Sequence, residues 1–325
     1  MLLIITNKLD TTADVVIDRL NRGNTPFVRW NTEDLLCSHK ITLKISAGKV
    51  VKALLRAEGR TVDLENDISV IWYRRPEKAP PHVAIRKSSH KEFARREGSM
   101  LLSNLWSLLG NKVWVNYPAN NLVLNNKLYQ LTLAEQLGMT TPATLVTNNP
   151  SEARRFIKEH GEVATKALSA GVLQDGKREK LIYTRKIREE DVAKFDSIRL
   201  CPTLFQAYVP KEIELRVTVI EDSVFACAIE SQRSARTVED WRRYDFSNVP
   251  HYPFTLPRKL HKQLITFLRK TGLKFGAFDF ILTPNGEYVF LEINPNGQWY
   301  WIEKLTGMPI TDRLVKLFEH CIERG

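Results

Sequence analysis

The chain has 325 residues, of which 43% are hydrophobic and 26% are charged, and this composition is typical of a soluble globular protein. Because this length exceeds what one core comfortably organises, we expect two or three domains. No apolar run approaches the roughly 20 residues that span a bilayer. The opening residues also lack the features of a signal peptide, so we expect a cytoplasmic protein with no membrane partner.

The formal charge of +11 and the pI of about 9.4 favour acidic partners. The sequence contains no helix-turn-helix, zinc-finger or RNP motif, so nucleic acid is not the expected partner. The cysteines form no CxxC pair and have no histidine at metal-binding spacing, so free thiols are expected at Cys37, Cys201, Cys227 and Cys321.

Strands and helices alternate in the first 116 residues, which predicts a small doubly wound sheet. No GxGxxG motif follows the first strand, so this region has no phosphate loop of its own. Residues 89–92 (SHKE) match a capping box for a long helix that runs to Leu109. The other predicted elements are a strand at 2–6, a helix at 11–22 ending on Gly23, a strand at 26–30, a hairpin turning at Ala47-Gly48, and a strand at 67–76.

The polar segment 115–127 reads as a connector and domain boundary. We place three domains at 1–116, 117–200 and 201–325. The predicted elements after the connector are helices at 127–138, 150–160 and 307–324, strands at 142–147, 162–168 and 204–211, and hairpins at 213–230 and 275–294.

The last hairpin carries the most informative polar residues. Asn285-Gly286 favours a two-residue loop with positive φ at both positions. That loop places Asp279 directly across from Glu292, with Asn294 one step further along the same face. The remaining residues predicted on that face, Ile281 and Phe290, are apolar.

Two carboxylates that face each other repel, and burying them is costly unless a cation is present. Mg²⁺ fits best because it takes few carboxylate ligands and leaves sites for water and phosphate. The alternative is a solvated strand end in which Asn294 forms an Asx-type turn.

Groups that could hold a phosphate lie upstream. Lys166 stands in an apolar strand and needs an anion or a route to solvent. Lys127 opens a helix, where its charge opposes the helix dipole unless an anion shares the site. Taken singly, each is better explained as a surface lysine than as a ligand. Gln206 could read a base edge and Glu212 could take ribose hydroxyls, although physics alone does not assign these roles.

The ordered set of Lys127, Lys166, the segment 205–216 (FQAYVPKEIELR), Asp279 and Glu292-x-Asn294 resembles the ATP-grasp superfamily. The resemblance implies an α/β (α+β ATP-grasp) fold, in which an N-terminal pre-ATP-grasp domain precedes a central lobe and a C-terminal lobe. It also implies ATP and two Mg²⁺ ions as cofactors. The implied roles are phosphate binding by Lys127 and Lys166, adenine binding by Gln206, Tyr208 and Val209, ribose binding by Glu212, metal binding by Asp279, Glu292 and Asn294, and charge stabilisation at the reacting phosphate by Arg216 and Arg242.

More narrowly, the stretches VIWYRRP, SARTVEDWRRYD and NPNGQWYWIEKLTGMPI resemble the microviridin-type, or graspetide, peptide maturases. This implies an ATP-dependent ligase that activates Asp or Glu side chains of a ribosomal precursor peptide as acyl phosphates. Ser or Thr hydroxyls or Lys amines then close ester or amide rings. The resemblance further implies a peptide with a leader and an acidic core, and a homodimeric enzyme. The implied peptide contacts are Arg233, Arg236 and Arg243 for the acidic core and Glu190 and Asp191 for the leader.

Two alternatives stay open from the sequence. One is an ATP-grasp ligase that adds an amino acid to a peptide or small molecule. The other is a basic, non-catalytic binding protein with this fold, which the intact lysines and metal-site residues disfavour. The sequence does not distinguish ester from amide formation, identify the peptide, or show how the short loop ALSAGV (residues 167–172) closes over phosphate.

Overall fold

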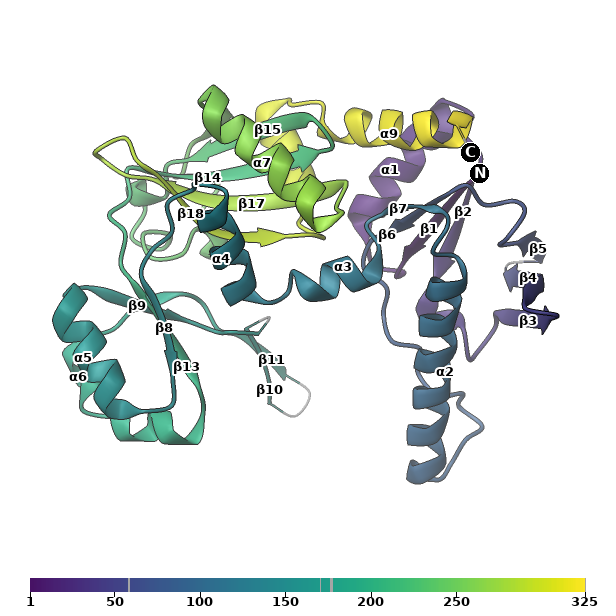
Figure 1. The fold of residues 1–325 in the computed structure, drawn as a ribbon, viewed down its shortest axis with the longest axis horizontal. Coiled ribbons are helices and arrows are strands. Elements are labelled where there is room, and N and C mark those ends of the chain that lie inside the picture. Colours follow the sequence, from purple (N-terminus) through teal and green to yellow (C-terminus); the bar gives the residue numbers. More distant parts are fainter. Residues whose placement is uncertain (58, 170, 176–177, 325) are drawn as a thin grey trace.

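The computed structural model describes residues 1–57, 59–169, 171–175 and 178–324. The chain forms an N-terminal domain and two further lobes, with the C-terminal lobe lying between the other two (Figure 1). Within these residues, no helix has the length and apolar character to cross a membrane.

The N-terminal domain is built on a parallel sheet with strand order β2-β1-β6-β7. Strand β1 is apolar and fully buried, because both faces of the sheet are covered. One face packs against α1 and the C-terminal helix α9, and the other against α2 and a small antiparallel sheet, β3-β4-β5. The bounds are β1 Leu2–Thr6, α1 Thr11–Arg22, β2 Phe27–Asn31, β3 Lys40–Ser46, β4 Lys49–Ala57, β5 Arg60–Asp63, β6 Val70–Tyr73, α2 Ser88–Leu108, β7 Val113–Val115, α3 Pro118–Val123 and α9 Ile310–Arg324.

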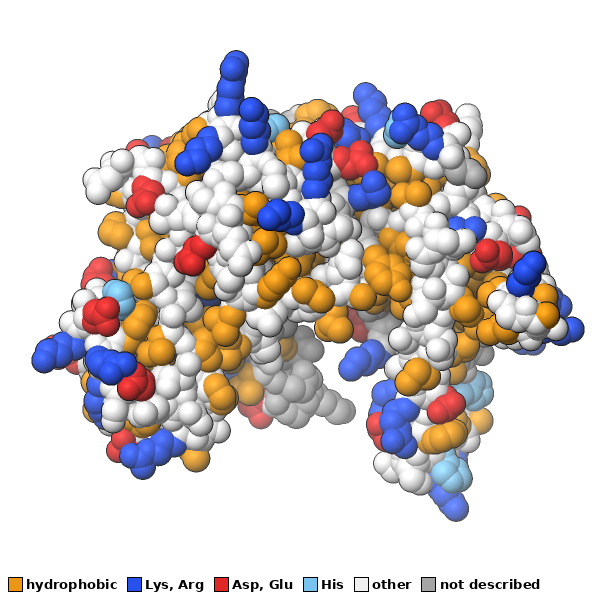
Figure 2. Space-filling view, in the orientation of Figure 1, with side chains coloured by type: hydrophobic (Ala, Val, Ile, Leu, Met, Phe, Trp, Pro, Cys, Tyr) orange, Lys and Arg blue, Asp and Glu red, His pale blue; other side chains and the backbone are white. Residues whose placement is uncertain are grey.

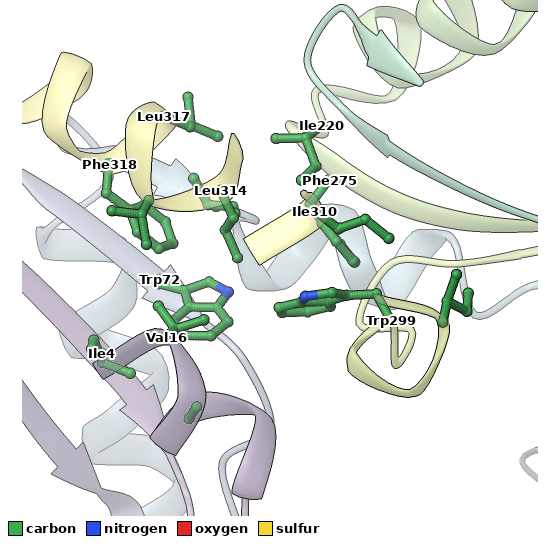
Figure 3. Packing of buried hydrophobic residues seen from close by; sticks show 14 of the residues in the cluster. Ile4, Val16, Trp72, Ile220, Phe275, Trp299, Ile310, Leu314, Leu317 and Phe318 are labelled. Atoms are coloured by element: carbon green, nitrogen blue, oxygen red, sulfur yellow. The ribbon is translucent and has the colours of Figure 1, made fainter. Parts of the chain in front are cut away.

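The return of α9 to the first domain joins the two ends of the chain in one core. Trp72 of β6 lies beside Trp299 and beneath Phe318 of α9, with ring centroids 6.2 and 5.4 Å away (Figure 3). Because this core includes residues of both ends, the segment that follows the last strand is fixed against the N-terminal domain.

The central lobe is an antiparallel sheet, β12-β9-β13-β8, covered on one face by α5. Its small core centres on Phe195 and Phe205. A separate hairpin, β10-β11, extends from it. The bounds are α4 Lys127–Gln136, β8 Thr144–Thr147, α5 Pro150–His160, β9 Val163–Lys166, β10 Val172–Asp175, β11 Arg178–Leu181, β12 Arg185–Lys186, α6 Glu189–Val192 and β13 Thr203–Ala207.

The C-terminal lobe is a five-stranded antiparallel sheet, β16-β15-β14-β17-β18. Helices α4 and α7 bury one face of this sheet in the second core. Part of the opposite face, including Ile220 and Phe275, packs in the core shared with α9, and another part carries the site described below. The bounds are β14 Ile213–Ile220, β15 Ser223–Ile229, β16 His251–Phe254, α7 Arg258–Thr271, β17 Phe275–Leu282, β18 Tyr288–Asn294 and α8 Tyr300–Thr306.

Most predicted elements are confirmed, including the hairpin whose turn residues Ala47 and Gly48 both have positive φ. The predicted capping box is wrong, because the N-cap of α2 is Lys87, two residues before Ser89, and Lys87 makes no side-chain cap bond. The connector is also more ordered than expected, since it contains α3. The sequence analysis did not predict α7 or the β10-β11 hairpin.

Candidate active site

The β17–β18 hairpin places Asp279 opposite Glu292, as predicted, but by a different route. The loop has three residues rather than two, since Thr283 pairs with Glu287 and only Gly286 has positive φ. This shifts the register by one, and a bulge at Leu291 shifts it back before Glu292. The bulge also makes the prediction for Phe290 wrong, since Phe290 lies in the apolar core on the other face.

Asp279 is buried, and its two carboxylate oxygens differ in their hydrogen bonding. Its Oδ2 accepts a hydrogen bond from Arg216 Nη1 at 2.8 Å, across the β14–β17 pair. Its Oδ1 is buried without any hydrogen-bond partner. Burial raises the pKa of Asp279, and the positive charge of Arg216 opposes this only in part. An unpaired buried carboxylate oxygen is a group that a cation would satisfy.

Glu292 lies between the two predicted lysines. Its Oε2 is 3.3 Å from Lys127 Nζ and 3.9 Å from Lys166 Nζ. Burial alone would raise the pKa of Glu292, but the charges of Lys166, Lys127 and Arg242 outweigh it and lower the pKa to about 2. Burial lowers the pKa of Lys166, which Glu292 counteracts. The three side chains therefore form one coupled charge cluster.

We expect this cluster to make stability depend on acid pH. A carboxylate whose pKa is lower in the folded state stabilises the fold above its ordinary pKa, here 4.5, and loses that contribution as pH falls toward about 2. The free energy of unfolding, measured by urea titration across that range, should therefore fall more steeply for the wild type than for Glu292→Gln. Equal slopes would show that Glu292 is not held ionised by the lysines.

A cavity with about 660 Å³ of empty space lies between the central sheet and the C-terminal sheet. Part of this space is open to solvent. Lys127 contacts Glu292 but does not itself line this cavity. Several predicted residues lie in its wall, namely Lys166, Gln206, Tyr208, Val209, Arg242, Asp279 and Glu292.

The residues predicted to bind adenine and ribose differ in whether they line the cavity. Gln206 is buried and donates from Nε2 to Thr144 Oγ1 at 2.9 Å. Glu212 is exposed and is not among the lining residues, whereas Glu214 is. Glu214 is buried and accepts hydrogen bonds from Lys211 Nζ and Ser231 Oγ. The sequence analysis did not predict Glu214. The signal that could have found it is the Glu-x-Arg pattern, which places two charged side chains on one face of an apolar strand.

The two arginines predicted at the reacting phosphate approach from different elements. Arg216 extends from the fully buried strand β14. Arg242 follows a loop and donates two hydrogen bonds to Asp240, and these bonds raise the pKa of Arg242. Asp240 also accepts from the backbone N–H of Thr184. Arg242 is thus held in place by a carboxylate that is itself buried.

The residues predicted to contact peptide lie further out. Arg233 and Arg236 are exposed, and Arg243 lies over the Tyr183 ring at 5.3 Å. Both carboxylate oxygens of Asp191 accept hydrogen bonds from Arg185. These hydrogen bonds lower the pKa of Asp191 to about 2. Glu190 is exposed.

The residues present fit a magnesium site with few protein ligands. In the described part of the chain, His, Cys, Asp and Glu side chains form no group of three or more suited to a metal. The available ligands are Asp279, with its unpaired Oδ1, and Glu292. Asn294 is exposed and its Oδ1 accepts from the Asn296 N–H at 2.9 Å, so the Asx-type turn of the alternative interpretation is present. A site this sparse suits Mg²⁺ that is also held by phosphate.

Two antiparallel sheets that enclose a cavity, with an acid pair in its wall and two lysines at one of these acids, are the arrangement of an ATP-grasp ligase. Residues 1–121 match the family model described as the MvdD pre-ATP grasp domain. No curated protein sequence matches the chain.

Three solved structures are similar over nearly the whole length. The macrocyclase MdnB from Microcystis aeruginosa MRC is 31% identical (TM-score 0.80; 97% of this chain and 98% of that chain covered). The macrocyclase MdnC from the same organism, bound with precursor peptide MdnA, is 29% identical (TM-score 0.85; 98% of each chain). A Chryseobacterium gregarium RiPP-associated ATP-grasp ligase, in complex with ADP and a leader and core peptide, is 29% identical (TM-score 0.87; 97% and 95%). The chain belongs to the microviridin-type family of ATP-grasp ligases.

Proposed function

We propose that the protein is an ATP-dependent peptide macrocyclase that joins Asp or Glu side chains of a ribosomal precursor peptide to Ser or Thr hydroxyls or Lys amines of the same peptide. The observation that carries this proposal is the charge cluster of Lys127, Lys166, Glu292 and Asp279 at the end of the cavity. Similarity to two macrocyclases over nearly the whole chain supports it.

The cavity would hold ATP with its base near Gln206, Tyr208 and Val209 and its phosphates near Lys127 and Lys166. Asp279 and Glu292, with Asn294 at the strand end, would hold Mg²⁺, which when bound offsets the phosphate charge. The ribose contact is proposed for Glu212, although Glu214, two residues further along the chain, is the one of these two acids that lines the cavity.

The reaction has two steps. An oxygen of the peptide carboxylate attacks the γ-phosphorus, and the bond from that phosphorus to the β–γ bridging oxygen breaks, which yields ADP and an acyl phosphate. The hydroxyl or amine then attacks the acyl carbon, loses its proton, and phosphate leaves. Arg216 and Arg242 would stabilise charge on the transferred phosphoryl group, since fixed donors in a buried site act without reorganisation.

The peptide would approach the cavity from the space between the N-terminal domain and the central lobe. Figure 2 shows the molecule hollowed between α2 and the lobe that carries α5. Arg233, Arg236 and Arg243 would contact an acidic core, because arginines pair with carboxylates. For the leader, Glu190 is the more available acid, because its ion pair with Arg188 is 4.0 Å long. Asp191 would first have to break its ion pair with Arg185. A homodimer and a cytoplasmic location remain predictions, and light scattering would test the first.

The test uses the full chain with ATP, Mg²⁺ and a candidate precursor peptide from a neighbouring short reading frame. We expect mass spectrometry to show the loss of one or more waters from the peptide, accompanied by ADP release. In a parallel reaction supplied with free amino acids, a gain of one amino-acid residue mass would instead indicate amino-acid addition. No mass change and no ADP would contradict ligase activity on that peptide.

A further inference from the structure

The short loop after β18, residues 295–298, is held from the N-terminal domain. Arg74, directly after β6, donates from Nη1 to the Asn296 carbonyl and from Nη2 to Gln298 Oε1 at 2.6 Å. Thr12 of α1 donates to the same Gln298 oxygen at 2.6 Å. Arg75 also donates to the Asn296 carbonyl, at 3.2 Å. Two elements of the first domain thus fix this loop.

The other side of the loop touches the active site. Arg216 Nη2 donates to the Gln298 carbonyl at 3.4 Å. A Cβ placed on Gly297 would lie 2.6 Å from Arg216 Nη2 and 2.3 Å from Ala277 Cβ, so the loop backbone packs directly on both. The same guanidinium pairs with Asp279 through Nη1. Any movement of the loop would therefore move the Arg216 side chain.

The contacts of Arg74 orient the 295–298 loop more than they stabilise the fold. Its side chain is 1% exposed, and its ion-pair partner Asp10, also 1% exposed, lies 3.5 Å from its Nε. Arg74 also lies over the Trp299 ring at 4.9 Å. A buried ion pair contributes little net stability, because desolvation offsets the attraction. A planar guanidinium instead fixes two acceptors in one direction.

We propose that Arg74 is a positioning residue for the ligase reaction, which acts through Gln298 and the 295–298 loop to hold Arg216 against Asp279. The N-terminal domain then contributes to the active site without touching the nucleotide. This inference rests on the proposed function for its kinetic consequences, but its structural consequence can be measured independently.

Gln298 gives the sharpest test. Arginine only donates, so the Gln298 oxygen must face Arg74 and Thr12. Gln298→Glu keeps an acceptor for both donors, whereas Gln298→Leu removes it at similar volume. We expect Gln298→Leu to lower kcat by about 10²-fold, since small misplacements at a reacting centre have this effect. ADP affinity should stay unchanged, and Gln298→Glu should keep most of the activity. Arg74→Lys should resemble Gln298→Leu.

The matched control is Arg29→Lys. Arg29 is a partly buried arginine of the same domain whose side chain bonds Asp14, Asn31 and the Asn7 carbonyl, and none of these partners belongs to residues 295–298. We expect it to leave kcat unchanged. An equal loss of kcat in Arg29→Lys, or full activity in Gln298→Leu, would overturn the proposal.

A crystal structure of Gln298→Leu supplies a readout besides activity. We expect the 2.8 Å contact between Arg216 and Asp279 to be lost while the fold and ADP binding persist. If the contact is retained, Arg74 does not position Arg216, whatever the reaction. If instead the wild type fails to dehydrate the peptide, the proposed function fails, and the structural comparison still decides the role of Arg74.

Discussion

Glu292→Gln should lower the turnover of ATP by about 10²- to 10³-fold. Glutamine keeps the volume of the side chain but not its charge, so it holds a divalent cation poorly. Glu292 is also the carboxylate that both Lys127 and Lys166 approach. The expected loss therefore comes from the electrostatics of the site and not from its shape. ADP release in the presence of Mg²⁺ and peptide measures it.

The same variant has a second expected effect with the opposite sign. Without Mg²⁺, Glu292 competes with phosphate for the two lysines. Removing its charge frees both amines, so Glu292→Gln should bind ATP more tightly than the wild type in buffer containing a chelator. Calorimetric titration with and without Mg²⁺ measures this. A misfolded variant would bind more weakly, so tighter binding together with lost turnover separates the two explanations.

Glu287→Gln is the matched control, because it makes the same change on the same hairpin. Glu287 is exposed and accepts a hydrogen bond from Thr140, outside the cavity wall. Its turnover and ATP affinity should equal those of the wild type. Wild-type turnover in Glu292→Gln would contradict the assignment of this residue to the metal site.

The hairpin shows how far the sequence could predict this site. Asn285-Gly286 located the turn, and facing acids indicated a cation site. The longer loop and the bulge at Leu291 could not be foreseen, because Leu291 reads as an ordinary apolar strand residue. Their two register shifts cancel at Asp279 and Glu292 but not at Phe290. The predicted pair is thus confirmed while its neighbour is not.

Contacts between distant segments were harder to predict. Arg74 follows an apolar strand and reads as a surface residue, yet it is buried by a loop 222 positions later in the chain. Nothing local indicates that contact, since it depends on α9 returning to the first domain. Glu214 differs, because a charge facing inward on a buried strand is visible in the sequence as Glu-x-Arg. Such residues are predictable as site candidates even where their partners are not.

Arg216→Met should both lower turnover by about 10²- to 10³-fold and destabilise the protein. Breaking a buried ion pair by removing one partner typically costs about 3–5 kcal/mol. The charge left behind is that of Asp279, which within the described residues accepts a side-chain hydrogen bond from Arg216 alone. Urea unfolding measures the stability, and ADP release measures the turnover.

The loss of unfolding free energy in Arg216→Met should depend on pH, and the pKa of Asp279 determines whether it grows or shrinks as pH rises. Burial raises the folded-state pKa of Asp279, so its contribution to stability is present below its ordinary pKa and is lost as pH rises through the raised value. Removing Arg216 raises that pKa further. The difference in unfolding free energy between wild type and Arg216→Met should therefore be larger at mildly alkaline than at mildly acidic pH.

Thr218→Val is the matched control for this prediction. Thr218 lies two residues along the same strand, fully buried, with a hydroxyl that has no hydrogen-bond partner. Because valine is nearly isosteric and leaves no charge unpaired, its stability should match or exceed that of the wild type at both pH values. If Arg216→Met shows the same loss of stability at both, Asp279 keeps one protonation state throughout.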